Sequence, residues 1–306
     1  MTVATLANGN LSATPIVFSK LATDFPKFKK KGLKDSFRFP QGCKLEQGNS
    51  RLYLPKIGWV RYFNSREVIG EIKNVTVSQK CGHFFVSIQT EFEAKIPTHK
   101  GGEIGIDMGI ARFATLSNGD FFAPLNAFKT YKGKLAKLQK QLKNKVKFSQ
   151  NWQKLKAKIA KLHHKIANCR KDFLHQTSNQ ISKKHAMIYV EDLLVANMSK
   201  SAKGTVEEPG KNVSQKSGLN RSILDQSWFE FRRQLDYKTQ WRGGFLVAVS
   251  PQNTSRTCPC CGLVAKANRE TQSHFECIAC GYSENADVVG AINILTKGRL
   301  QLETVF

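Results

Sequence analysis

Hydrophobic and polar residues alternate in several runs of the first hundred residues. The runs cover residues 51–55, 71–77 and 83–90, and Gly and Pro residues lie between them. Alternation with a period of two is typical of strands with one buried face. We therefore predict an antiparallel sheet arranged as a partial β-barrel domain over residues 25–100. Residues 1–24 form a poorly patterned N-terminus, which we expect to be poorly ordered.

From residue 101 the alternation gives way to short apolar runs and helical periods. In chain order, the predicted elements are three strands at 103–107, 112–116 and 120–123, a helical segment, a strand at 186–191, a helix at about 223–241, a strand at 244–249 and a C-terminal helix. This order is that of a ribonuclease-H-like α/β fold, which we predict over residues 101–306. Residues 196–222 are rich in Ser, Lys, Gly and Asn, and we expect a mobile loop there.

Between the third and fourth of these strands, apolar residues recur at intervals of three and four. This spacing is typical of amphipathic helices, and the turn residues at 148–151 divide the segment in two. We therefore predict a helical hairpin at about 129–170, in which the apolar stripes of the two helices pack together. The residues of these stripes are Leu135, Leu138, Leu142, Leu155, Ile159, Leu162 and Ile166.

The chain is strongly basic, with 48 Lys and Arg residues against 23 Asp and Glu residues and a formal net charge of +25. An excess of this size indicates a polyanionic partner, with nucleic acid as the first candidate. No acidic residue lies between Asp120 and Asp172, so the lysines of the predicted hairpin have no nearby carboxylate in sequence. We expect this hairpin to contact phosphates, and a solvated basic arm is the alternative. The candidate lysines are Lys134, Lys137, Lys140 and Lys143.

Four cysteines near the C-terminus form two Cys-x-x-Cys pairs with fifteen residues between the pairs. The spacing is typical of a zinc ribbon, which we predict at about residues 255–283. Four thiolates complete the coordination of the ion, so its role would be structural. Two disulfides are the alternative, and Cys260 competes with Cys261 as a ligand. The predicted ligands are Cys258, Cys261, Cys277 and Cys280.

The rest of the sequence favours a reducing compartment. There is no N-terminal hydrophobic signal and no apolar run long enough to span a bilayer. Other cysteines are scattered along the chain, at Cys43, Cys81, Cys169 and Cys260. We therefore expect a cytoplasmic protein with no membrane partner, in which paired cysteines bind metal rather than form disulfides.

Three acidic residues occupy comparable places in the predicted fold. Asp107 and Glu191 each end an apolar strand, and Asp287 begins the C-terminal helix. In a ribonuclease-H-like fold these carboxylates would converge, and Mg²⁺ prefers such oxygen ligands. Two such ions about 4 Å apart would support phosphodiester hydrolysis. Each acid alone could be an ordinary strand-end or helix-cap residue, and Asp192 competes with Glu191, since neighbours on a strand point to opposite faces.

Several segments together resemble the TnpB family, transposon-encoded nucleases first labelled OrfB-type transposases and related to type V CRISPR effectors. The resemblance covers residues from about 25 to 298. The matching segments are 105–109 (GIDMG), 113–115 (FAT), 190–193 (VEDL), 254–258 (TSRTC) with the predicted zinc ribbon, 286–287 (AD) and 291–294 (AINI).

The resemblance implies a RuvC-like nuclease domain with an inserted zinc ribbon, preceded by a wedge-like barrel domain. It also implies an RNA-guided DNA endonuclease that uses Asp107, Glu191 and Asp287, with Glu191 rather than Asp192 as the ligand. Guide RNA and target DNA would be its partners, with structural Zn²⁺ and catalytic Mg²⁺ as its metals.

The chain departs from the family pattern at two places. Members of the family carry wedge and recognition-helix segments before the part that residues 25–29 resemble, and this chain begins almost there. Family members also commonly have an Asn and two Ala residues where Val288, Val289 and Gly290 follow Asp287. The intact acids favour the enzyme. The short N-terminus favours a module that binds guide RNA or DNA without productive cleavage. A transposase that carries out strand transfer is the third reading.

Overall fold

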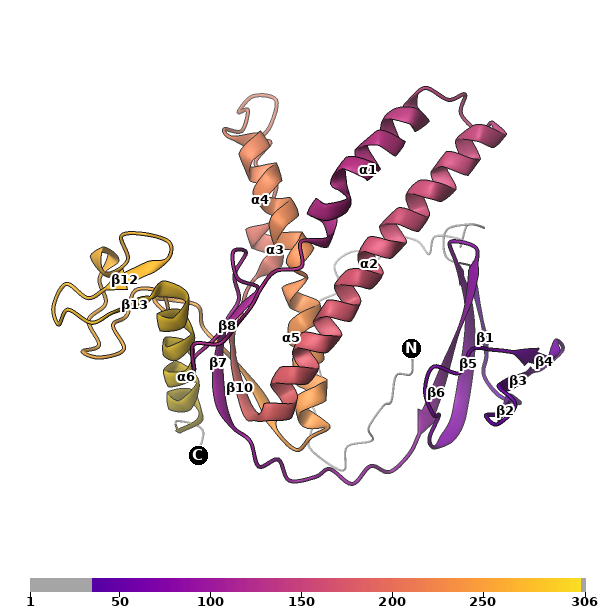
Figure 1. The fold of residues 1–306 in the computed structure, drawn as a ribbon, viewed down its shortest axis with the longest axis horizontal. Coiled ribbons are helices and arrows are strands. Elements are labelled where there is room, and N and C mark those ends of the chain that lie inside the picture. Colours follow the sequence, from indigo (N-terminus) through magenta and orange to yellow (C-terminus); the bar gives the residue numbers. More distant parts are fainter. Residues whose placement is uncertain (1–34, 304–306) are drawn as a thin grey trace. The chain divides into compact units, whose positions relative to one another are not determined.

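The computed structural model describes residues 35–303 and divides the chain into two units, one ending at Lys95 and the other beginning at Ile96. The described strands of the first unit form two three-stranded antiparallel sheets (Figure 1). One sheet has the order β1-β5-β6, with β1 at Ser36–Phe39, β5 at Glu71–Lys80 and β6 at His83–Glu91. The other contains β2 at Lys44–Glu46, β3 at Arg51–Leu54 and β4 at Gly58–Arg61.

The predicted alternation places one face of these strands in a common core. Val75 and Val77 on β5 and Ile88 on β6 are buried with Leu52 and Leu54 of β3. The three strands predicted for this region, β3, β5 and β6, are therefore present, and β1, β2 and β4 are additional. The expected segment at 1–24 lies outside the described residues, and the closed arrangement of a barrel stays a prediction.

The second unit is built on a five-stranded sheet of order β11-β10-β7-β8-β9. The strands β7, β8 and β9 form an antiparallel meander, whereas β10 lies parallel to both β7 and β11. All five strands lie where the hydrophobic pattern predicts them. Their bounds are β7 at Gly102–Asp107, β8 at Ala114–Leu116, β9 at Phe121–Phe122, β10 at His185–Glu191 and β11 at Phe245–Val249.

Helices cover both faces of this sheet (Figure 1). On one face, α2 (Gln150–Lys184) and α5 (Trp228–Gln240) pack against β10, and their Leu174 and Phe231 join Ile106 and Ile188 in the main core. On the other face, α6 (Ala286–Glu303) packs against β7, β8, β10 and β11. The second unit is thus a mixed α/β structure in three layers. No helix within residues 35–303 is long and apolar enough to cross a membrane.

The C-terminal helix approaches the sheet unusually closely. A Cβ atom at Gly105 of β7 would lie 2.1 Å from the carbonyl oxygen of Ala291 in α6. Any larger residue at that position would push the helix away from the strand. The glycine therefore sets the spacing between the strand that ends in Asp107 and the helix that begins near Asp287.

The region after β10 differs from the prediction. In place of the predicted loop, residues 196–222 include most of α3 (Val195–Met198) and the first ten residues of α4 (Val213–Gln226). The helix expected at 223–241 is divided by Ser227, whose φ is 58°. The sequence of α4 has a weak apolar period, and tertiary contacts stabilise it: Lys216 donates to the carbonyl of Met198, and Asn220 donates to those of Ser199 and Lys200.

Candidate active site and metal centre

Two of the predicted acids end neighbouring parallel strands. Val190 of β10 lies opposite Ile106 of β7, so the next residues, Glu191 and Asp107, lie at the same end of the sheet. Parallel strands necessarily bring their carboxyl ends to one edge. The third acid, Asp287, is the second residue of α6, which packs across these strands. The three acids therefore lie at one edge of the sheet. In the sequence, 84 positions separate Asp107 from Glu191, and 96 positions separate Glu191 from Asp287.

The other two acids act electrostatically on Asp107. Burial, followed by the negative charges of Glu191 and Asp287, raises the pKa of Asp107 from 3.8 to about 7. Burial also raises the pKa of Glu191, which is only 9% exposed. A buried carboxylate whose ionised form is disfavoured by neighbouring acids becomes stable as an anion when a cation neutralises the charge. The arrangement is therefore suited to binding positive charge.

Glu191 is held by Thr254, to which no local sequence pattern assigns a role. The hydroxyl of Thr254 donates a hydrogen bond of 2.5 Å to Oε1 of Glu191. Asn293 of α6 in turn donates to the carbonyls of Thr254 and Thr257. This chain of contacts fixes the orientation of the Glu191 carboxylate relative to the helix that carries Asp287.

Asp287 is not the cap of its own helix. The side-chain oxygen of Asn285 accepts the backbone N–H of Asp287, which is the role of a capping residue. The Asp287 carboxylate instead lies 3.7 Å from the guanidinium of Arg269. The positive charge of Arg269 also opposes part of the rise in the pKa of Asp107 and of Glu191. Arg269 lies between the two cysteine pairs, and nothing in the local sequence distinguishes it from the other basic residues.

The competing acid, Asp192, points elsewhere. It is exposed and forms an ion pair with Arg232 of α5, while its backbone N–H donates to the carbonyl of Val249. Successive residues of an extended segment point to opposite faces. The structure therefore separates Asp192 from Asp107 and directs Glu191 toward the other acids.

Gly290 lies beside the first acid. A Cβ atom at this position would be 3.1 Å from Oδ2 of Asp107, which is closer than ordinary van der Waals contact. The Asp107 carboxylate thus packs against the bare backbone of α6. This glycine belongs to the segment in which the chain departs from the TnpB sequence pattern.

The four predicted cysteine ligands form a compact cluster. Their sulfur atoms all lie within 4.8 Å of one another, and among residues 35–303 no other group of three or more His, Cys, Asp or Glu side chains is this compact. The Sγ atoms of Cys258 and Cys280 are 3.6 Å apart, and those of Cys261 and Cys277 are 3.5 Å apart. A disulfide needs about 2.05 Å, whereas a tetrahedron with Zn–S bonds of about 2.3 Å gives sulfur separations of about 3.8 Å. The cluster can hold a metal ion such as zinc.

Two equivalent turns present these sulfur atoms. Gly262 and Gly281, with φ of 76° and 71°, donate from their backbone N–H to the carbonyls of Cys258 and Cys277 respectively. Each turn requires a left-handed residue after its second cysteine, which glycine adopts without strain. Cys260 is exposed and is not part of the cluster.

The metal cluster shares its core with α6. Phe275 of β12 (His274–Glu276) is fully buried with Cys258 and Cys277, and Ala286 and Val289 of α6 complete this core. The strand β13 (Ser283–Asn285) pairs with β12 and leads directly into α6. Folding of the cysteine module and placement of Asp287 are therefore linked.

The predicted helical hairpin consists of α1 (Ala127–Lys143) and the N-terminal part of α2. Leu135, Leu162 and Ile166 are buried between the two helices, as the apolar pattern predicts. All four candidate lysines are exposed, at Lys134, Lys137, Lys140 and Lys143. The hairpin therefore presents positive charge to solvent, which is what a phosphate-binding surface requires.

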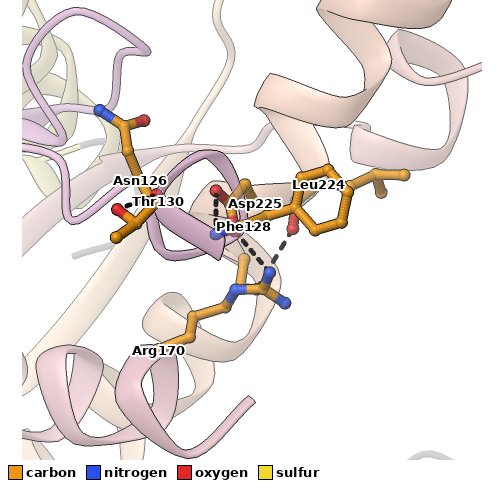
Figure 2. Close-up of polar contacts among 7 residues, drawn as sticks. Asn126, Phe128, Thr130, Arg170, Leu224 and Asp225 are labelled. Carbon is orange, nitrogen blue, oxygen red and sulfur yellow. Dashed lines mark hydrogen bonds and ion pairs between the residues drawn. The ribbon is translucent and has the colours of Figure 1, made fainter. Parts of the chain in front are cut away.

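An acid from a distant helix anchors the base of this hairpin. Both carboxylate oxygens of Asp225, in α4, accept the backbone N–H of Phe128, at 3.0 and 3.2 Å, and Arg170 of α2 forms an ion pair with the same carboxylate (Figure 2). The residue before α1, Asn126, is left-handed and makes no capping hydrogen bond with its side chain. Asp225 thus supplies the missing cap and connects α1, α2 and α4.

The lysine surface gives a prediction about salt dependence. Replacing Lys134, Lys137, Lys140 and Lys143 with Gln should weaken binding to unrelated sequences by similar factors, because phosphates carry no sequence information. The slope of log K against log salt on duplex DNA should flatten by up to about 0.9 per lost phosphate contact. Fluorescence anisotropy titrations at several salt concentrations would measure both quantities.

Lys73→Gln is the matched control for these lysines. Lys73 lies 2.8 Å from both Glu71 and Glu91, so its charge is already paired. Its substitution should leave the slope unchanged. An unchanged slope for the fourfold variant would mean that the hairpin lysines face only solvent.

Comparison with known proteins places the chain in a family. The probable transposase family OrfB_IS605 matches residues 83–202, and the Cas12f1-like TNB domain matches residues 228–294. The chain is 58% identical over 286 residues to the InsQ protein of Escherichia coli strain K12, provisionally named an RNA-guided DNA endonuclease, and the match covers 93% of this chain and 71% of that protein. A protein of Streptomyces pristinaespiralis with the same provisional activity is 32% identical over 230 residues, covering 74% of this chain and 53% of that protein.

Among solved structures, the chain is similar to one determined by cryo-electron microscopy of a Cas12f1–sgRNA–target DNA complex. The identity is 17% and the TM-score is 0.43, with 88% of this chain and 68% of that chain covered. The chain thus spans about two thirds of that protein and between half and three quarters of the two sequence relatives.

Proposed function

The chain belongs to the TnpB (OrfB-type) family of transposon-encoded nucleases, and we propose that it is an RNA-guided DNA endonuclease with Asp107, Glu191 and Asp287 as its catalytic acids. The observation that carries the proposal is the placement of these three acids at one edge of the sheet, where burial and the charges of Glu191 and Asp287 raise the pKa of Asp107 to about 7. Buried acids without a bound cation destabilise a fold, and a purely structural role would not compensate for this cost.

The donor set fits magnesium. Three carboxylates provide only hard oxygen ligands, and Mg²⁺ prefers these over nitrogen or sulfur. Asp107, Glu191 and Asp287 would hold the ions. Bound there, the ions would supply an activated water and stabilisation of the departing oxygen in phosphodiester hydrolysis, as in two-ion sites.

Side chains around the acids would position them and the substrate. The hydroxyl of Thr254 fixes the Glu191 carboxylate, so that the ligand oxygens need no reorientation when the metal binds. Arg269 brings a positive charge beside Asp287, and Lys297 brings another near Glu191. These charges would attract the DNA phosphate toward an edge that otherwise carries three acids.

The fold that we infer for the second unit is ribonuclease-H-like, with the RuvC arrangement of acids. Its support is the antiparallel meander β7-β8-β9 continued by the parallel strands β10 and β11. The cysteine module would be its structural zinc ribbon, and the first unit would correspond to the wedge-like domain. Guide RNA and target DNA would lie against the basic surfaces, including the hairpin lysines.

A cleavage assay with the nucleic acid that co-purifies with the protein tests the proposal. RNA extracted from the purified protein would be sequenced, and plasmids that carry its complement beside randomised flanking sequence would be incubated with the complex and Mg²⁺. We expect cleavage at matched sites. Glu191→Ala and Asp287→Ala should abolish cleavage and leave RNA binding nearly intact, because the acids hold metal while basic surfaces hold nucleic acid.

Asp192→Ala is the matched control, since Asp192 is an adjacent acid that points away from the site. It should cleave like the wild type. Binding of RNA and DNA without cleavage at any Mg²⁺ or Mn²⁺ concentration would contradict the nuclease and identify a binding module. DNA ends joined to new strands, in place of free ends, would identify strand transfer.

A further inference from the structure

The turn between α1 and α2 lies far from the sheet (Figure 1). Two large apolar side chains are exposed at this turn. Val146 is 79% exposed and Phe148 is 68% exposed. Since α1 has 17 residues, a rise of 1.5 Å per residue places this turn about 25 Å from the start of the helix. Neither residue contributes to the buried core between the helices. Val146 and Phe148 therefore leave apolar surface exposed to solvent at a protruding turn. Exposed apolar surface of this kind is typical of interaction sites.

The aromatic rings at this turn are arranged together. The rings of Phe148 and Trp152 have centroids 5.5 Å apart and are inclined by 58°. The ammonium group of Lys147 lies 5.2 Å from the centroid of Phe148, and that of Lys156 lies 5.0 Å from the centroid of Trp152. We call Val146, Lys147, Phe148, Trp152 and Lys156 the hairpin tip. It combines exposed aromatic surface with positive charge.

The hairpin tip is held in one conformation. Phe148 has a φ of 70°, a left-handed backbone that is strained for a bulky side chain. The side chain of Ser149 accepts the N–H of Trp152, and the side chain of Gln153 donates to the carbonyl of Phe148. These contacts fix the backbone after Phe148, and the backbone N–H of Ser149 donates to the carbonyl of Val146, which closes the turn before it. A preorganised side chain loses less entropy on binding than a flexible one.

We propose that the hairpin tip is a stacking site for a nucleobase whose face is uncovered, either in a single strand or at the end of a duplex. The inference rests on the proposed function in that it requires a nucleic-acid partner. Phe148 and Trp152 would contact the base, while Lys147 and Lys156 would approach the flanking phosphates. This contact would add to the phosphate contacts that we expect of Lys134, Lys137, Lys140 and Lys143, which are exposed on α1.

Charge distinguishes a nucleic acid from other partners for this surface. The segment between Asp120 and Asp172 contains no acid, so an apolar protein partner would have to tolerate uncompensated lysines. Bases offer an aromatic face and phosphates offer a negative charge, which matches the two components of the tip. The inner bases of a duplex have both faces covered, and for this reason we expect a preference for uncovered ones.

Oligonucleotides with and without bases test the proposal. Phe148→Ala should weaken binding to a short single strand of either DNA or RNA by roughly tenfold, as is usual when one stacking aromatic is removed. Binding to a strand of the same length in which every nucleotide is abasic should not change, because its phosphates are all present. The slope of log K against log salt should also stay constant. Running the DNA and RNA arms side by side shows which strand the tip prefers.

Three further variants make the result decisive. Phe148→Trp should bind like the wild type, and Phe148→Leu should bind as weakly as Phe148→Ala, because leucine keeps apolar area but has no aromatic face. Phe63→Ala removes an aromatic residue that is 92% exposed in the first unit and should have no effect. Full binding by Phe148→Leu would indicate simple apolar docking and would overturn the proposal.

The outcomes also separate this inference from the proposed function. If the wild type binds no oligonucleotide, both fail. If Phe148→Ala binds and cleaves as the wild type does, only the stacking site fails. Loss of binding to vesicles that contain anionic phospholipid, with unchanged oligonucleotide binding, would identify a membrane contact and overturn the stacking site.

Discussion

Asp107→Asn should abolish cleavage and at the same time make the metal-free protein more stable near pH 8. Burial and the charges of Glu191 and Asp287 raise the pKa of Asp107 from 3.8 to about 7 in the folded protein. A raised pKa means that the folded state retains a proton that the unfolded state has released. The contribution of Asp107 to stability is therefore fully present below about pH 4 and is lost as the pH rises to about 7.

The asparagine variant removes this pH dependence because its amide is neutral at every pH. At about 1.4 kcal/mol per pKa unit, the variant should exceed the wild type in free energy of unfolding by on the order of 2–4 kcal/mol at pH 8, and by little at pH 4. Urea unfolding at both pH values, in buffer free of Mg²⁺ and of strong chelators that would strip zinc, measures the difference. Added Mg²⁺ should stabilise the wild type and not the variant.

Asp192→Asn is the control for this experiment as well. Asp192 is exposed and paired with Arg232, so its substitution should not stabilise the protein at pH 8. If Asp107→Asn were less stable than the wild type at pH 8, the acids would not repel one another in the folded protein. The proposal that they await a cation would then lose its main support.

Cys277→Ser should remove the zinc ion from the cysteine cluster. It should also abolish DNA cleavage, although the catalytic acids Asp107, Glu191 and Asp287 are unchanged. Cys277 is buried in a core that includes Ala286 and Val289 of α6, on either side of Asp287. The apparent binding free energy of structural zinc is on the order of 10–16 kcal/mol in zinc-finger peptides, and it drives their folding. Loss of one ligand should therefore loosen the start of α6 and the placement of Arg269.

Metal analysis and thermal unfolding check this prediction. We expect about one zinc per wild-type chain, as one four-thiolate site requires, almost none in Cys277→Ser, and a lower melting temperature and little DNA cleavage in the same variant. Cys260→Ser, at an exposed position outside the cluster, should keep its zinc and its stability. Zinc-free wild-type protein with full stability, or a mass decrease that indicates disulfides, would contradict the zinc site.

Much of the candidate site could be predicted from the sequence because its signals are local. The two Cys-x-x-Cys turns each need only five consecutive residues, and the structure brings all four sulfur atoms together. Strand ends are local as well, so Asp107 and Glu191 could be placed on β7 and β10 before their separation in space was known. The hairpin followed from leucines three and four residues apart, which share one helical face.

The tertiary structure alone decided which residues surround these acids. Thr254 reaches Glu191 across 63 positions of sequence, and Arg269 reaches Asp287 from within the cysteine module. No local period marks such residues, since their roles arise only when the strand order and the packing of α6 are fixed. The choice of Glu191 over Asp192 has the same origin: a strand offers both faces to its neighbours, and only the folded sheet determines which face meets Asp107 and Asp287.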